Sequence, residues 1–420
     1  MNPSVLESRS NLWKAIGPGI LVACTAVGAS HLVWSTRAGA DFGWSLLGLV
    51  LLANLLKFPF FLYGQRYTAA TGESLLAGYH RLGVGYVYVF LTINILTGAI
   101  NIAGIGMVTG ALLSGYGFLN LSVPVLSIAV LAFCGLLILL GRYRFLDGMA
   151  KVVMGVLIVA TFAALALAAM KGGVAEPDFV GPSPWTWVSF AFLISLLGWM
   201  PAPVDLSAWS SLWMFSREKQ TGHFATVKES GIDFYLGYSM GVLLAVGFVG
   251  LGALVMFGSG ESFSGSGVAF AQQLVNLYAQ NIGDWSRPLI LTAAFITMFS
   301  TSITALDGYP RSLAACCSLI GGLSHSAFNR IHQVWIVISL VLASGVILFW
   351  AQSLIHLLTF AAVISFLTSP ILAAINFKVM CGKNVPKAYR PGWFLHILSW
   401  SGLAFFLVMT LGYLYVVFWM

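Results

Sequence analysis

The chain has 420 residues, of which 59% are hydrophobic and only 8% are charged. Soluble domains of ordinary composition carry roughly 25% charged residues, so this composition excludes a water-soluble globular protein. It indicates instead one membrane domain that spans residues 1–420. The formal charge of +7 does not indicate nucleic-acid binding, because the basic residues are scattered singly and form no stripe with interleaved aromatic residues.

Apolar runs long enough to cross a bilayer recur along the whole chain. A hydrocarbon core about 30 Å thick requires roughly 20 apolar residues per helix. The sequence therefore predicts an all-α integral membrane protein with eleven transmembrane helices, at residues 16–36, 44–65, 86–110, 122–141, 148–171, 185–214, 236–257, 287–309, 333–351, 355–377 and 394–419.

The basic residues between these runs predict the orientation. Sixteen lysines and arginines, from Arg9 through Arg142 to Arg390, fall on one side, and only Arg37, Lys171 and Arg287 fall on the other. Cytoplasmic loops hold the excess of positive charge. We therefore expect a multi-pass protein of the cell membrane with a cytoplasmic N-terminus and an external C-terminus. Two amphipathic segments, residues 71–79 and 268–279, are expected to lie along the membrane interface.

The first and sixth helices each contain residues that interrupt a helix. The first carries Gly17-Pro18-Gly19 and then a break over Val27 to His31, and the sixth carries Leu197-Gly198-Trp199-Met200-Pro201-Ala202-Pro203. Proline removes a backbone donor and disfavours helical geometry in the residue before it. Inside a bilayer, an unwound backbone is tolerated only where it is buried in protein or lines a wet cavity.

Two interrupted helices five apart are typical of transporters built from inverted repeats, in which the cargo binds between the unwound segments. We expect repeat 1 over residues 16–171, repeat 2 over 185–377, and an additional helix over 394–419. The predicted cargo site comprises Gly28, Ala29, Ser30, His31, Leu197, Met200, Pro201 and Ala202. The alternative is that these prolines and glycines merely kink the helices.

Ionisable groups within the spans are costly and are often functional. His31 follows the first break and suits a proton relay or a hydrogen bond to the cargo, or else it is satisfied by a neighbouring carbonyl. Asp205 falls at the start of the second half of helix six, where it caps that half or carries a proton. Lys57 is expected to snorkel or to pair with a carboxylate, and Asp307 to pair structurally with Arg311.

The eighth predicted helix carries Ser300, Thr301, Ser302 and Thr304. Ser300 and Thr301, together with His31 and Asp205, are the candidate residues for a coupling H⁺ or Na⁺. Hydroxyls bonded back to their own helix are the alternative. The five cysteines show no disulfide or metal spacing and are expected to be packing residues.

Several motifs resemble the Nramp proteins, the proton-coupled transition-metal importers. They are Gly17-Pro18-Gly19, the run from Arg37 to Leu47, the run from Ala69 to Leu75, Met200-Pro201, and Ser300 to Thr304. The resemblance implies a LeuT-type fold, with a metal ion held between the broken helices one and six. The usual Asp-Pro-Gly-Asn of helix one falls at Gly28 to His31, and the usual histidine of helix six is Ala202. Only Met200 and the carbonyl near Leu197 remain of that ligand set, which indicates a divergent branch.

These observations predict a secondary active transporter that moves a small solute, which we expect to be a cation, by alternating access. Without an Asp at position 28, His31 and Met200 are the side chains left to bind a metal ion, since imidazole and thioether suit borderline and soft cations. No resident cofactor is expected, nor an enzyme, since the sequence has no HExxH, GxSxG or phosphate-loop motif. The alternatives are an ion-coupled transporter of a small organic acid or amino acid, and a non-transporting sensor. The oligomeric state is left open.

Overall fold

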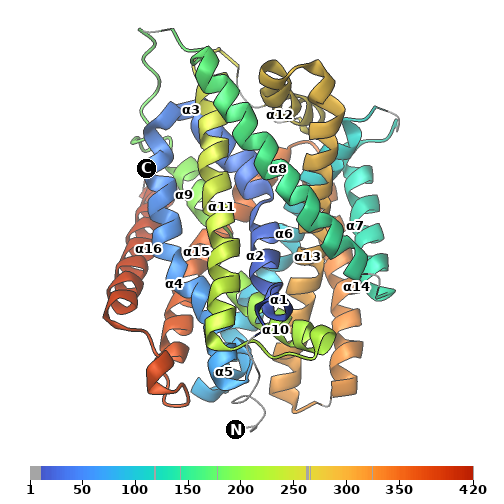
Figure 1. Cartoon of the computed structure of the whole chain (residues 1–420), viewed down its shortest axis with the longest axis vertical. Helices are drawn as coiled ribbons and strands as arrows, with labels where there is room; N and C mark the ends of the chain where they lie inside the picture. Colours follow the sequence, from blue (N-terminus) through green and yellow to red (C-terminus); the bar gives the residue numbers. More distant parts are fainter. Residues whose placement is uncertain are drawn as a thin grey trace.

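The computed structural model describes residues 11–117, 120–141, 143–176, 178–261, 264, 266–323 and 325–419, and these residues form helices without a strand. Most of the long helices run roughly along the long axis of the molecule, and α8 crosses them obliquely (Figure 1). Arg9 and Arg142 of the charge count lie outside the described residues. The long apolar helices confirm the all-α membrane architecture.

The first half of the chain contains the first five predicted spans. After α1 (Leu12–Ala15), the broken first span comprises α2 (Pro18–Ala26), the π-helix η2 (Ser30–Ser35) and α3 (Thr36–Phe42). Then follow η3 (Gly43–Leu46), α4 (Leu47–Thr71), α5 (Leu75–Leu82), α6 (Val84–Ser114), α7 (Val123–Leu139) and α8 (Tyr143–Lys171). Gly43 has φ of 58° and allows the sharp turn between α3 and η3.

The second half repeats this order. The broken sixth span comprises α9 (Phe190–Trp199) and α10 (Leu206–Thr221), followed by α11 (Val227–Val255), α12 (Gly267–Ile282) and η4 (Asp284–Ser286). The remaining helices are α13 (Arg287–Gly321), α14 (His325–Phe349), α15 (Leu354–Met380), η5 (Lys387–Tyr389) and α16 (Trp393–Trp419). Helix α16 lies at the edge of the bundle (Figure 1), and many of its large apolar side chains are exposed.

The amphipathic segment predicted at 268–279 lies within helix α12, whereas only residues 75–79 of the segment predicted at 71–79 belong to helix α5. Seven helical segments among the described residues are long and apolar enough to cross a membrane, and three further apolar helices are shorter. The chain is therefore a multi-pass membrane protein, while the count of eleven spans and the sidedness of the termini stay predictions. The sixth span begins later than predicted: α9 starts at Phe190, and residues 185–189 precede the helix.

Glycines set the distance between α11 and the broken first span. A Cβ atom on Gly237 would lie 2.0 Å from the carbonyl oxygen of Gly19, and one on Gly252 would lie 2.1 Å from that of Thr36. Helix α11 therefore packs backbone to backbone against both α2 and α3. Small residues permit such close approach in membrane bundles. This contact fixes the two halves of the first span on either side of their break.

Candidate functional site: a cavity between two broken helices

The first span unwinds between Ala26, the last residue of α2, and Ser30, the first residue of η2. The predicted break over Val27 to His31 is confirmed at its N-terminal part, whereas Ser30 and His31 are already helical. Gly28 lies against α13, where an added Cβ would come within 2.9 Å of Thr301 Cγ2. The Thr301 hydroxyl donates a hydrogen bond of 3.0 Å to the carbonyl oxygen of Cys24, one turn before the break.

The sixth span unwinds between α9 and α10, over residues 200–205, three residues beyond the start predicted from the sequence. Leu197 and Gly198 belong to the last turn of α9, and the Met200–Pro201 peptide bond is cis. The break is confirmed, but the carbonyl oxygen of Leu197 belongs to the C-terminal end of α9 and not to the unwound segment. Proline lacks a backbone N–H and disfavours helical geometry only in the residue directly before it. Pro201 therefore interrupts the helix at Met200, and residues 197–199 stay helical.

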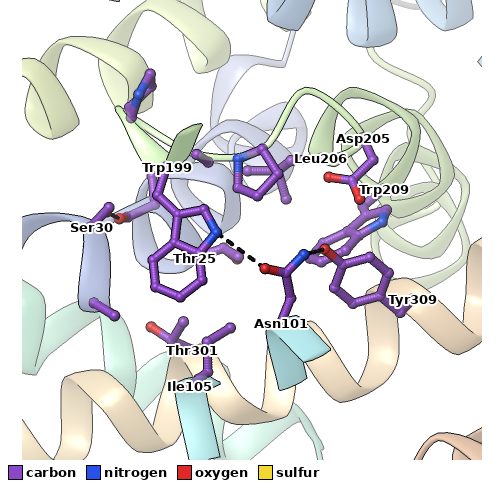
Figure 2. Close-up of a pocket in the computed structure, with 15 residues that line it drawn as sticks. Thr25, Ser30, Asn101, Ile105, Trp199, Asp205, Leu206, Trp209, Thr301 and Tyr309 are labelled. Carbon is purple, nitrogen blue, oxygen red and sulfur yellow. Dashed lines mark hydrogen bonds between the residues drawn. The ribbon is translucent and has the colours of Figure 1, made fainter. Parts of the chain in front are cut away.

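A cavity lies between the two breaks. It leaves about 40 Å³ for the centres of water-sized molecules, and roughly 10–15 Å³ suffices for one water. Figure 2 shows the arrangement of its walls. The lining residues come from helices α2, η2, α6, α9, α10 and α13 and from the two breaks: Thr25, Ala26, Ala29, Ser30, Asn101, Ile105, Trp199, Pro201, Ala202, Pro203, Asp205, Leu206, Trp209, Thr301 and Tyr309.

Asn101 organises the polar part of this wall. Its Oδ1 accepts a hydrogen bond of 3.1 Å from the indole Nε1 of Trp199, and its Nδ2 donates one of 2.7 Å to the Tyr309 hydroxyl (Figure 2). Ser365 on α15 joins the same group at 3.1 Å. A buried amide is costly unless its donors and acceptor are satisfied. Asn101 therefore links α6, α9, α13 and α15 around the cavity.

Asp205 is the acidic residue of the lining. It occupies the N-cap position of α10, as the sequence predicts, but its side chain makes no capping hydrogen bond. The residue is 3% exposed, and its Oδ1 has no hydrogen-bond partner among the described residues. Trp209, one turn further along α10, also lines the cavity, and its indole Nε1 has no hydrogen-bond partner in the described part of the chain. An unpaired buried carboxylate oxygen is costly, so Asp205 is suited to a positively charged or hydrogen-bonding ligand.

His31 lies apart from the cavity lining. Its ring Nε2 lies 2.9 Å from the carbonyl oxygen of Gly241 on α11, and its Nδ1 lies 2.7 Å from the Ser30 hydroxyl and 2.8 Å from the carbonyl oxygen of Ala26. Neighbouring protein groups therefore satisfy the histidine, as in the alternative predicted from the sequence. Met200 is fully buried and does not line the cavity either. The geometry therefore gives no support to a metal ion held by the His31 imidazole and the Met200 thioether.

The remaining predicted residues divide in the same way. Ala29, Ser30, Pro201, Ala202, Asp205 and Thr301 line the cavity, whereas Gly28, Leu197 and Ser300 do not. The hydroxyl of Thr304 donates to the carbonyl of Ser300 in its own helix, as the alternative reading predicts. Asp307 accepts two hydrogen bonds from Arg311, at 2.6 and 2.9 Å, and one from Trp213. The predicted structural pair is therefore confirmed.

Nine of the fifteen lining residues were not among the predicted site residues, and these nine include Asn101 and three aromatic residues with polar side-chain atoms, Trp199, Trp209 and Tyr309. Asn101 is the one with a usable signal, because an amide in the middle of an apolar run must find partners within the protein. Aromatic residues are common in membrane helices, so the sequence alone does not distinguish these three from packing residues.

Lys57 was recognised as an intramembrane cation, but its partners differ from the prediction. It does not snorkel, and it forms no direct ion pair with a carboxylate of the described residues. Its Nζ donates hydrogen bonds to the carbonyl oxygens of Leu197, Gly198 and Ala202, at 2.7, 2.9 and 3.0 Å. A carbonyl at a helix end has no partner within its own helix, and for this reason the end of α9 attracts a donor.

Comparisons with known proteins agree with this architecture. The family model for natural resistance-associated macrophage protein-like (Nramp) proteins matches residues 19–416. The uncharacterized protein PM0681 of Pasteurella multocida (strain Pm70) is 38% identical over 372 residues, which cover 88% of this chain and 85% of that protein.

Solved structures with a similar fold include two mutants of the manganese transporter of Eremococcus coleocola. One superimposes with a TM-score of 0.68 at 14% identity and the other with 0.69 at 15% identity. In each case the match covers 97% of this chain and 88% of the other. At this identity the likeness establishes the fold, which is the LeuT-type arrangement with discontinuous first and sixth helices. By its family model and its fold, the chain belongs to the Nramp family of membrane transporters.

Proposed function

We propose that the chain is a secondary active transporter that carries a small cation through the cavity between its two broken helices by alternating access. The observation that carries this proposal is that Asp205 lines the cavity and that its buried Oδ1 has no hydrogen-bond partner among the described residues. A cation in the cavity supplies the missing partner and compensates the charge. Alternating access follows from the family and from the position of the cavity between two segments that interrupt their helices.

A hard divalent metal ion is the cargo that family and cavity together favour. The solved neighbours are described as manganese transporters, and the cavity offers oxygen atoms from Asp205, Asn101, Ser30, Thr25 and Tyr309. Oxygen ligands suit Mn²⁺ and Mg²⁺, whereas soft ions prefer sulfur. The described residues contain no group of three His, Cys, Asp or Glu side chains that could hold a metal ion. We therefore propose that the ion keeps part of its hydration shell in the cavity, as Mg²⁺ commonly does.

An organic acid as cargo is less well supported. The backbone N–H groups of Leu206, Ser207 and Ala208 at the start of α10 donate to the carbonyls of Pro203, Val204 and Asp205. The N-terminus of this half-helix therefore has few free donors for a carboxylate. Asp205 would in addition repel an anionic cargo. These contacts favour a cation over an acid.

Transport into proteoliposomes tests the proposal and also excludes or reveals a non-transporting sensor. We expect ⁵⁴Mn²⁺ uptake into vesicles that contain the full chain, faster when the inside is negative and when the outside is acidic. Asp205→Asn should reduce this uptake at least tenfold. Asp284→Asn should leave it unchanged, because Asp284 is an exposed carboxylate in η4 that pairs with Arg287. Uptake of radiolabelled lactate or alanine, or equal Mn²⁺ uptake by the Asp205→Asn variant, would contradict the proposal.

A further inference from the structure

Lys57 is the most deeply buried cation among the described residues, with an exposure of 0%. Its ammonium group has three N–H donors, and each has a carbonyl acceptor within 3.0 Å, from Leu197, Gly198 and Ala202. The three oxygens come from the last turn of α9 and from the break itself. The ammonium is thus held by backbone oxygens alone, as a small inorganic cation would be held.

Electrostatics explains why the Lys57 ammonium lies at the end of α9. The C-terminal end of a helix carries a partial negative charge and unpaired carbonyls, and an unwound segment in the bilayer adds more. In transporters with broken helices, such ends and carbonyls coordinate a coupling ion. Here the charge of Lys57 is close enough to Asp205 for the two to interact. The ammonium therefore neutralises both the helix end and part of the carboxylate charge.

The backbone of α4 holds Lys57 at this place. Lys57, Gly64 and Thr68 lie seven and four residues apart, which places them on one face of the helix. A Cβ atom on Gly64 would lie 2.1 Å from the carbonyl oxygen of Ser207 in α10, and the Thr68 hydroxyl lies 2.7 Å from that of Ser211. This face therefore contacts α10 while Lys57 contacts α9. The contacts span the break and hold the two halves of the sixth span together.

We infer that the Lys57 ammonium is a tethered cation that permanently occupies the carbonyl site at the break of the sixth span, in the place of a free Na⁺ or metal ion. The carbonyls of Leu197 and Ala202 are consequently not ligands of the transported cation, which meets Asp205 instead. No Na⁺ is needed to complete this break. The inference does not depend on which cargo the protein moves, because it concerns a site that is already filled.

Thermal unfolding of the purified full chain in lipid nanodiscs tests this inference without any transport. Wild-type protein, Lys57→Ala and Lys57→Met are compared in choline, sodium, potassium and ammonium chloride at equal ionic strength. The wild type should have the same Tm in all four salts. Lys57→Ala should unfold several degrees lower in choline and recover a large part of the loss in sodium, potassium or ammonium, because a free cation then enters the vacated site.

Lys57→Met separates a cation site from a packing role. The methionine side chain fills much of the same space without a charge, so its Tm should fall and no added cation should restore it. Lys378→Ala is the matched control, since Lys378 is an exposed lysine that donates to the Tyr86 hydroxyl. A saturable rise of the wild-type Tm with Na⁺ would overturn the inference. A Lys57→Ala Tm that no cation raises, or a Lys57→Met Tm equal to that of the wild type, would also overturn it.

The wild-type protein alone can overturn the inference even if neither Lys57 variant folds. A tethered cation predicts equal Tm and equal ⁵⁴Mn²⁺ uptake of the wild type in sodium and in choline. A dependence of either quantity on Na⁺ overturns the inference. If the wild-type protein does not transport ⁵⁴Mn²⁺ but its Tm is equal in all four salts, the result counts against the proposed cargo and not against the tethered cation.

Discussion

The carboxylate of Asp233 on α11 accepts a hydrogen bond of 2.9 Å from the backbone N–H of Gly17, at the N-terminus of α2. A second hydrogen bond comes from the N–H of Gly19. Both N–H groups belong to the first turn, where no helical carbonyl is available, and the helix dipole favours a negative charge there. Asp233 therefore secures one half of the broken first span to its neighbour.

Replacement of Asp233 by Asn should loosen α2. The amide cannot accept both hydrogen bonds with the strength of a carboxylate, and charge-assisted hydrogen bonds are worth roughly 1.5–3 kcal/mol each. We expect faster amide hydrogen exchange in residues 18–26 and a lower Tm. Asp41→Asn, which removes a partly exposed pair with Arg37, should leave the exchange of α2 unchanged. Equal protection of residues 18–26 in Asp233→Asn and wild type would refute this role.

Two glycines of α11 offer a matched test of helix packing. A Cβ on Gly237 would lie 2.0 Å from the carbonyl of Gly19, whereas a Cβ on Gly241, one turn further, would meet no atom within 4 Å. Gly237→Ala should destabilise the protein by about 1–3 kcal/mol or more, because a tightly packed site does not accept an added methyl. Gly241→Ala should be neutral or slightly stabilising. The folded yield and Tm of the two variants measure the difference, and equal values would contradict the backbone contact.

Asn101 should be necessary for the shape of the cavity. Asn101→Ala removes the acceptor for Trp199 and a donor to Tyr309, and each unsatisfied buried group costs roughly 1–3 kcal/mol. We expect a marked loss of ⁵⁴Mn²⁺ uptake together with a lower Tm. Ile105→Val, one turn further along α6 in the same cavity lining, is the control for volume alone. Wild-type uptake by Asn101→Ala would show that the network is dispensable.

Acid should weaken the ion pair between Glu73 and Arg81, which lies outside the predicted membrane spans. Arg81 donates two hydrogen bonds to the Glu73 carboxylate, one of them 2.6 Å long, and these bonds hold the pKa of Glu73 below its usual value. A lowered pKa stabilises the folded state above the unfolded pKa of about 4.3. That stability is lost as the pH falls through the folded value. The pair is partly exposed, so the contribution is about 0.2–1 kcal/mol.

Thermal unfolding between pH 6 and pH 3 measures this contribution. The Tm of the wild type should fall more steeply over this range than that of Glu73→Gln, which has no charge to lose. The two curves should converge at the acidic end. Parallel curves would mean that the pair adds nothing to stability.

Much of the fold could be predicted from the sequence, because long apolar runs and prolines constrain the backbone directly. Apolar runs must be helical in a bilayer, and Pro18, Pro201 and Pro203 mark interruptions that α2, α9 and α10 display. Helix limits were less predictable, since α13 continues to Gly321 beyond its apolar stretch.

The candidate site was predicted less completely from the sequence. The position of a residue in the chain does not show which groups of other helices it contacts. His31 was a candidate for cargo or proton binding, yet the carbonyls of Ala26 and Gly241 surround its ring. Lys57 was expected to snorkel or to pair with a carboxylate, yet its hydrogen bonds go to three carbonyls of the sixth span, and Asp205 interacts with it only through its charge. The roles proposed for Asp205, Ser300 and Thr301 in cargo or ion coupling stay predictions.

Thiol labelling from both sides of the membrane tests most directly whether the cavity is a transport pathway. Ala202→Cys is placed in a chain whose partly exposed Cys317 and Cys381 are replaced by serine, and a membrane-impermeant methanethiosulfonate is applied to right-side-out and to inverted vesicles. We predict labelling of Ala202→Cys from each side, whereas Val180→Cys, in an exposed loop, reacts from one side only. Labelling of Ala202→Cys from one side alone, or from neither, would contradict alternating access through this cavity.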